Sequence, residues 1–229
     1  KKLHSSNEAK NLQSESFRRL VFDELCANFL TLSENRKRIK KEKTPKIFEN
    51  TISNRILKEL PFELTKSQES ALNEINLDLK NSKRMFRILQ GDVGSGKTIV
   101  SFLTIANVLE SNYQCALMSP TEILSLQHFH LAQKIFKKIN IRIEFLTGKT
   151  SYSKRKEILK DLAEGKINFL IGTHSLFQKK IKFKNLGYVV IDEQHKFGVK
   201  QRSDLAKKGG KNCDLLLMST TPIPRTMMM

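Results

Sequence analysis

Apolar and polar residues alternate in two different patterns along the chain, and the pattern changes near Pro61. Beyond Pro61, short runs of β-branched and apolar residues predict strands at 85–90, 114–119, 142–146, 168–172, 188–192 and 214–219. The longer amphipathic stretches between them predict helices at 66–79, 97–110, 122–138 and 153–164, with a weaker one at 199–207. Strands that alternate with helices at this spacing are typical of βαβ units. We therefore expect an α/β fold, with a parallel sheet that carries helices on both faces.

The pattern before Pro61 is helical. Apolar residues recur at spacings of three and four over 14–32, and a second helix is predicted at 47–60, where Pro61 stops it. We therefore divide the chain into a helical segment, 1–60, and an α/β domain, 61–229. Because parallel sheets bind ligands at the C-terminal ends of their strands, the chemistry should lie in the loops that follow each strand.

The charge balance suggests a class of partner. The 229 residues include 41 lysines and arginines against 23 acidic residues, which gives a net charge of +18. Such an excess is typical of proteins that bind nucleic acid, although a merely soluble basic protein has the same balance. No apolar run reaches the roughly 18 residues of a membrane span. The three scattered cysteines favour a reducing, cytoplasmic location over a disulfide framework or a zinc site.

The first predicted strand runs into a phosphate-binding pattern. Its residues are Gly91-Asp92-Val93-Gly94-Ser95-Gly96-Lys97-Thr98, the P-loop sequence in its required place between a strand and a helix. The glycines let backbone N–H groups turn inward around a phosphate, and the helix start adds its positive dipole end. Lys97 supplies a charge for the β- and γ-phosphates, and the Thr98 hydroxyl is placed to bind Mg²⁺.

The fifth predicted strand delivers two acids at its end, in the run Asp192-Glu193-Gln194-His195. Asp192 is the candidate magnesium carboxylate, held mostly through water. Glu193 is the candidate general base that polarises the attacking water. An Asp-Glu pair alone is common on protein surfaces, but together with a P-loop it indicates a Walker B motif.

Other loops have a chemical and a plain structural interpretation. The Gln68 amide can pair with adenine, while Thr65 can serve as an N-cap for the next helix, and both can hold. The loops that start at Ser119 and Gly172 offer small hydroxyl residues and helix starts, which suit phosphate contacts or ordinary caps equally. After the sixth strand, hydroxyls over 219–226 can reach His195 or Glu193, or form a simple strand exit.

Together these motifs resemble those of superfamily 2 helicases and translocases, and within them the RecG family of bacterial DNA helicases. Segments 60–68, 89–98 and 119–129 resemble the Q-motif region, motif I and motif Ia. Leu146-Thr147-Gly148 and Gly172-Thr173-His174 resemble the next DNA-facing loops, and 192–202 and 221–226 resemble motifs II and III. Thr220 departs from the family, which usually has alanine there.

The resemblance implies a P-loop NTPase domain of the RecA type that binds ATP and Mg²⁺ and uses ATP hydrolysis to move on duplex DNA. It makes Lys97, Asp192 and Glu193 catalytic. It implies DNA contacts by Pro120, Thr121, Gly148, Gly172 and Thr173, and coupling of the two sites by Gln194, His195, Thr221 and Arg225.

The same resemblance implies a larger protein. A DNA-binding wedge domain would precede residue 1, with 1–60 as its linker, and a second RecA-like domain carrying the arginine finger would follow residue 229. The partner is expected to be branched or forked DNA. The full-length protein is expected to be a monomeric motor in DNA repair and recombination, and the present chain alone nearly inactive.

Two alternatives remain open. A transcription-repair coupling factor has a similar motor, but its acidic tetrad usually reads Asp-Glu-Glu-His, so Gln194 favours the RecG family. A nucleotide-binding switch without helicase activity is the alternative from a different class. ATP turnover that DNA stimulates would separate a motor from a switch.

Overall fold

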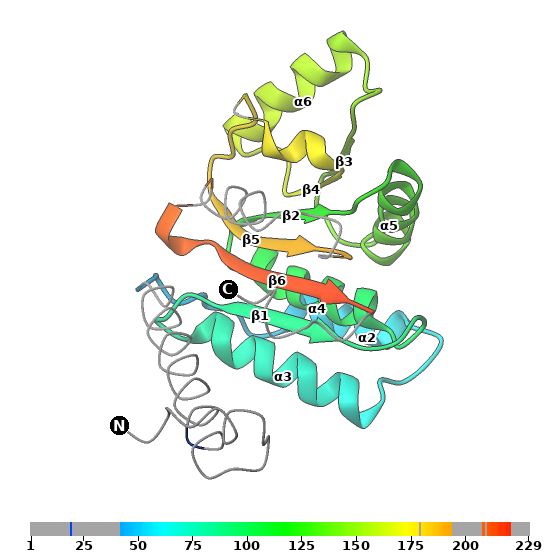
Figure 1. Cartoon of the computed structure of the whole chain (residues 1–229), viewed down its shortest axis with the longest axis vertical. Helices are drawn as coiled ribbons and strands as arrows, with labels where there is room; N and C mark the ends of the chain where they lie inside the picture. Colours follow the sequence, from blue (N-terminus) through cyan, green and yellow to red (C-terminus); the bar gives the residue numbers. More distant parts are fainter. Residues whose placement is uncertain (1–18, 20–41, 179, 194–207, 209, 221–229) are drawn as a thin grey trace, which may run out of the picture. The chain divides into compact units, whose positions relative to one another are not determined.

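Six parallel strands form one sheet in the order β1-β6-β5-β2-β4-β3 (Figure 1). The computed structural model describes residues 19, 42–178, 180–193, 208 and 210–220. The strands are β1 (Phe86–Gln90), β2 (Gln114–Met118), β3 (Ile143–Leu146), β4 (Phe169–Gly172), β5 (Leu186–Ile191) and β6 (Asp214–Ser219). The helices are α2 (Thr51–Glu59), α3 (Lys66–Lys80), α4 (Lys97–Glu110), α5 (Glu122–Ile135) and α6 (Tyr152–Glu164), with 3₁₀ turns η2 (His174–Phe177) and η4 (Gly210–Asn212).

The predicted α/β fold with a parallel sheet is confirmed, and all six predicted strands are present. Two predicted helix bounds were wrong by more than two residues. The helix predicted at 47–60 begins at Thr51, because Asn50 takes a left-handed backbone with φ of 63°. The helix predicted at 122–138 ends at Ile135, where a turn bond from Ile139 N to Phe136 O takes over. The helices predicted at 14–32 and 199–207 lie outside the described residues.

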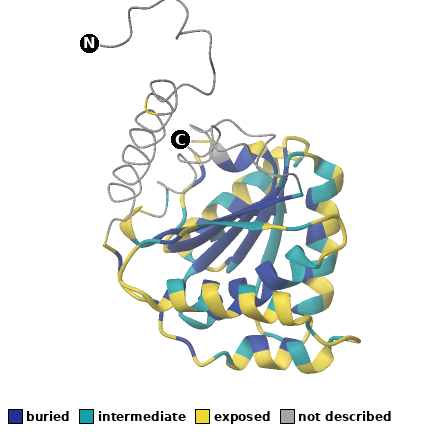
Figure 2. Ribbon diagram, turned by 60° about the horizontal axis from the view of Figure 1, so that its bottom comes forward, coloured by how far each residue is buried: buried dark blue, intermediate teal, exposed yellow. Residues whose placement is uncertain are grey.

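Helices cover both faces of the sheet. Successive residues of a strand point to opposite faces, and the strand residues divide accordingly between two hydrophobic clusters. On β5, Tyr188 and Val190 join the cluster that contains α4, while Val189 and Ile191 join the cluster that contains α6. The four inner strands, β6, β5, β2 and β4, are buried, and the helices around them have exposed outer surfaces (Figure 2). Among the described helices, none combines the length and the apolar character needed to cross a membrane.

Residues 42–60, which the sequence assigned to the helical segment, belong to the same compact unit as the sheet. Phe48 and Ile56 are buried in the cluster that contains α4. The carboxylate of Glu110, the last residue of α4, accepts hydrogen bonds from Glu49 N at 2.7 Å and Ile52 N at 3.2 Å. This carboxylate satisfies backbone donors at the start of α2, which Asn50 leaves without a side-chain cap.

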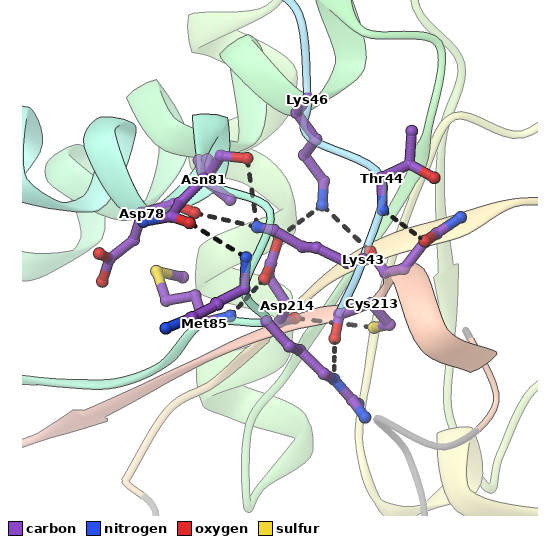
Figure 3. Close-up of polar contacts among 12 residues, drawn as sticks. Lys43, Thr44, Lys46, Asp78, Asn81, Met85, Cys213 and Asp214 are labelled. Carbon is purple, nitrogen blue, oxygen red and sulfur yellow. Dashed lines mark hydrogen bonds and ion pairs between the residues drawn. The ribbon is translucent and has the colours of Figure 1, made fainter. Parts of the chain in front are cut away.

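A buried ion cluster fastens the segment before α2 to the start of β6 (Figure 3). The Nζ atoms of Lys43 and Lys46 lie 2.6 Å and 2.5 Å from Oδ2 of Asp214, and all three side chains are fully buried. The other carboxylate oxygen, Oδ1, accepts a hydrogen bond from Met85 N at 2.6 Å. Lys43 also donates to the Leu79 carbonyl at the end of α3. The cluster lies at the N-terminal end of β6, away from the edge that carries the predicted chemistry.

Candidate functional site

The strand order divides the predicted motifs into two groups along the C-terminal edge of the sheet. The P-loop follows β1, the acidic pair follows β5, and Thr220 follows β6, so these three loops share the half formed by β1-β6-β5. The three predicted DNA-facing loops follow β2, β4 and β3, which form the other half. The two halves meet where β5 pairs with β2.

The P-loop is closed on itself by its lysine. Lys97 Nζ donates to the Gly91 carbonyl at 2.5 Å and to the Asp92 carbonyl at 2.7 Å. Gly91 N donates to Ser219 O at 3.2 Å, which ties the loop to the end of β6. Lys97 also starts α4, so the positive end of that helix opens toward the loop. A ring of backbone around a lysine at a helix start is the arrangement that holds phosphate groups.

Gln68 joins the start of α3 to the P-loop. It forms a capping box with Thr65, in which Gln68 N donates to Thr65 Oγ1 and Gln68 Oε1 accepts from Thr65 N. The cap predicted at Thr65 is therefore confirmed. Gln68 Nε2 also donates to Ser95 O at 2.9 Å, and a Cβ on Gly96 would lie 2.2 Å from that nitrogen. The φ of 83° at Gly96 favours glycine, and a Cβ there would displace the Gln68 amide from its contact with Ser95. Pairing of Gln68 with adenine stays a prediction.

The Asp192 carboxylate is held on both oxygens. Asp192 directly follows β5 and is 9% exposed. Its Oδ2 lies 2.8 Å from Nε2 of His128, a buried residue of α5, and its Oδ1 accepts from Glu193 N at 3.0 Å. These contacts fix the direction in which the carboxylate faces.

Glu193 carries a strained backbone and a hydroxyl partner. Its φ of 47° is left-handed, a conformation that non-glycine residues adopt rarely and that recurs at functional sites. Thr220 Oγ1 donates to its carboxylate, at 3.1 Å from Oε1 and 3.3 Å from Oε2. The residue at which the chain departs from the family pattern therefore contacts the predicted general base.

The donor set fits a hard cation. Thr98 offers a hydroxyl and Asp192 a carboxylate, and Mg²⁺ takes oxygen ligands, with one or two carboxylates at its protein sites. Thr98 follows β1 and Asp192 follows β5, on either side of β6. Both residues therefore lie on the half of the edge that carries the P-loop.

A comparison of the sequence with models of known protein families decides to which family the chain belongs. The model of the DEAD/DEAH box helicase family matches residues 65–229. The chain belongs to the DEAD/DEAH box helicase family. Its sheet, P-loop and acidic pair form a RecA-like helicase domain, as the sequence predicted.

Relatives within this helicase family are similar over most of the chain. It is 45% identical to the ATP-dependent DNA helicase RecG of Aquifex aeolicus, over 99% of this chain and 30% of that protein. It is 47% identical to RecG of Thermotoga maritima, over 91% of this chain and 27% of that protein. The structure of RecG bound to a three-way DNA junction matches with a TM-score of 0.81 and 43% identity, over 92% of this chain and 28% of that chain. The chain thus spans less than a third of the length of these relatives.

Each of the three predicted DNA-facing loops of this helicase domain is held by short-range contacts. Thr121 caps α5 by accepting from Leu124 N at 3.3 Å. A Cβ on Gly172 would lie 2.1 Å from the Leu146 carbonyl, so glycine permits the close approach of β4 to the end of β3. Lys149, beside Gly148, forms an ion pair with Glu122 at 2.8 Å, which lowers the pKa of Glu122. This pair joins the loop after β3 to the start of α5.

The remaining predicted site residues lie outside the described residues. They are the four coupling candidates, Gln194, His195, Thr221 and Arg225. One contact of the site was missed. The motif Ia resemblance covers His128 but does not predict its contact with Asp192, which is 64 residues away in the sequence. The apolar spacing of α5 is a sequence signal that marks His128 as an inward-facing position.

Proposed function

We propose that this chain is the first RecA-like motor domain of an ATP-dependent DNA helicase that acts on branched DNA, as the names of its RecG relatives suggest. The strand order supports the proposal, since it puts the predicted nucleotide loops on one half of the sheet edge and the predicted DNA-facing loops on the other. In the natural-length protein, a wedge domain would bind DNA, and a second motor domain would supply the arginine finger.

In the proposed reaction, ATP is hydrolysed to ADP and phosphate. Lys97 exchanges its two carbonyl contacts in the P-loop for oxygens of the β- and γ-phosphates. The N–H groups at the start of α4 face the same phosphates and stabilise the charge that develops on them. When ATP binds, the contacts of Lys97 to the P-loop backbone are therefore replaced by contacts to the phosphates.

Thr98 and Asp192 would hold Mg²⁺, which supplies charge neutralisation at the phosphates when bound. Glu193 would accept a proton from the attacking water, within hydrogen-bond reach of its carboxylate. Thr220 keeps that carboxylate in place through its hydroxyl. Gln68, which donates to Ser95 O, would transmit adenine binding to the P-loop.

The DNA backbone would run along the loops at Pro120-Thr121, Gly148 and Gly172-Thr173. Thr121 is exposed at the start of α5, where backbone N–H groups suit phosphate oxygens. Contacts of this kind are independent of base sequence, as a motor that tracks the backbone requires. The net charge of +18 agrees with a polyanionic partner.

The test is ATP turnover by the natural-length protein, measured without DNA, with linear duplex and with a three-way junction. A motor couples the DNA loops to hydrolysis, so we expect junction DNA to raise the turnover. Equal rates under all three conditions would contradict the proposal and favour a nucleotide switch. Stimulation by linear duplex equal to that by the junction would instead favour a coupling-factor-like translocase.

A further inference from the structure

One helix links the two halves of the sheet edge. Three residues of the α5 segment, Thr121, Ser125 and His128, recur at spacings of four and three, so they lie on one side of the helix. Thr121 caps its start in the first DNA-facing loop. Ser125 Oγ donates to Gly172 O at 3.0 Å, and Gly172 opens another DNA-facing loop. His128 Nε2 lies 2.8 Å from Asp192 Oδ2 on the nucleotide half.

The contact between His128 and Asp192 is built into the core. His128 is 8% exposed, and its ring packs edge-on against Phe102 of α4, with 6.5 Å between the ring centroids. Ser125 is fully buried. Short, buried contacts of this kind cannot slide independently, because protein interiors are close-packed. A shift of the start of α5 would therefore be passed to the carboxylate of Asp192.

We propose that His128 is a positioning residue, through which α5 couples the DNA-facing loops to the magnesium carboxylate. The inference rests on the proposed function and adds to it the residue that connects the two sites. His128 donates a hydrogen bond to Oδ2, while Glu193 N donates to Oδ1, so the carboxylate is set from both sides. Hydrogen-bond partners of this kind orient metal-binding side chains and contribute about 10–100-fold to metal affinity or activity.

Three substitutions of His128 separate the hydrogen bond from packing. His128→Phe keeps a ring against Phe102 but removes the donor. His128→Gln places an amide nitrogen at a reach similar to that of Nε2, and His128→Asn offers the same amide on a shorter side chain. The matched control is His130→Phe, because His130 is an exposed residue of the same helix.

The first readout is binding of a fluorescent, non-hydrolysable ATP analogue, titrated with Mg²⁺ in the natural-length protein. We expect His128→Phe and His128→Asn to raise the Mg²⁺ concentration needed for half-maximal binding about 10–100-fold. His128→Gln should stay within a few-fold of wild type, and His130→Phe should not change it. Binding without Mg²⁺ should be equal in all variants, a result that a general packing defect would not give.

The second readout is the ratio of junction-stimulated to basal ATP turnover. We expect His128→Phe and His128→Asn to lose most of this stimulation and His128→Gln to retain it. If wild type binds the analogue but all variants share its Mg²⁺ dependence and its stimulation, the role of His128 is wrong and the proposed function stands. A raised Mg²⁺ requirement with unchanged stimulation would refute the coupling. If wild type binds no nucleotide, the proposed function itself fails, and the inference falls with it.

Discussion

Thr220 Oγ1 donates a hydrogen bond to both carboxylate oxygens of Glu193, at 3.1 Å and 3.3 Å. Thr220 follows β6 and Glu193 follows the neighbouring strand β5, so the contact is set by sheet pairing. A side chain that must take a proton from water at a defined position gains from such a restraint. The threonine that departs from the family pattern therefore has a structural role at the predicted base.

Replacing Thr220 with valine, which has the same shape and no hydroxyl, should lower the turnover number for ATP. A hydrogen bond to a charged group is worth roughly 1.5–3 kcal/mol, so we expect a loss of about tenfold or more. Binding of the ATP analogue should be unchanged, because Thr220 faces Glu193 and not the P-loop lysine. Thr220→Ser keeps the hydroxyl and should restore most of the rate. A Thr220→Val enzyme with the wild-type turnover number would show that the contact has no catalytic effect.

The cluster around Asp214 should dominate the stability of the segment before α2. Asp214→Asn removes the carboxylate charge with which both Lys43 and Lys46 pair, and both ammonium groups stay buried. Removing one partner of a buried ion pair costs about 3–5 kcal/mol, and we expect a loss of this size in the free energy of unfolding. Lys43→Met should cost less, because Lys46 still pairs with Asp214. Denaturant unfolding measures the stability of both variants. Equal stability of Asp214→Asn and wild type would contradict the stabilising role of the cluster.

Burial lowers the pKa of Lys43 below its ordinary value of 10.5, although Asp214 opposes the shift. Between the lowered pKa and 10.5, the unfolded chain binds more protons at this site than the folded chain. The contribution of Lys43 to the free energy of unfolding therefore rises with pH through that window. Wild type should gain stability relative to Lys43→Met as the pH rises toward 10.5. A difference between the two that stays constant or falls with pH would exclude the shift.

DNA binding should depend on salt, and Lys149 should contribute to it. Lys149 lies in a predicted DNA-facing loop with its side chain 85% exposed. Each neutralised phosphate adds about −0.9 to the slope of log affinity against log salt, so Lys149→Ala should flatten the slope by roughly one. Lys138 is the matched control, since it is exposed and also pairs with a glutamate, but lies beyond the other end of α5. Equal effects of Lys149→Ala and Lys138→Ala would argue against this DNA path.

Local patterns were sufficient for the elements and the loops of the site. The apolar runs of β1 to β6 and the P-loop pattern depend on neighbours in the sequence, so both could be predicted from it. The contacts that give the site its form join distant residues. His128 and Asp192 are 64 residues apart, and Lys43 and Asp214 are 171 apart. Only the strand order brings such residues together, and periodicity carries no information on that order. The predicted start of α2 was wrong for a local reason: Asn50 takes a left-handed backbone, which apolar spacing does not reveal.

The most direct measurement compares two variants of the proposed ATP site, Lys97→Ala and Glu193→Gln, in the natural-length protein. Both are assayed for binding of a fluorescent ATP analogue with Mg²⁺ and for ATP turnover with junction DNA. Lys97→Ala should lose detectable binding, because it removes the charge at the centre of the phosphate loop. Glu193→Gln should bind like wild type and lose about 10²–10⁴-fold in turnover, because it keeps the shape of the side chain and removes the base. Unchanged binding in Lys97→Ala, or turnover within a few-fold of wild type in Glu193→Gln, would contradict the proposed ATP-driven motor.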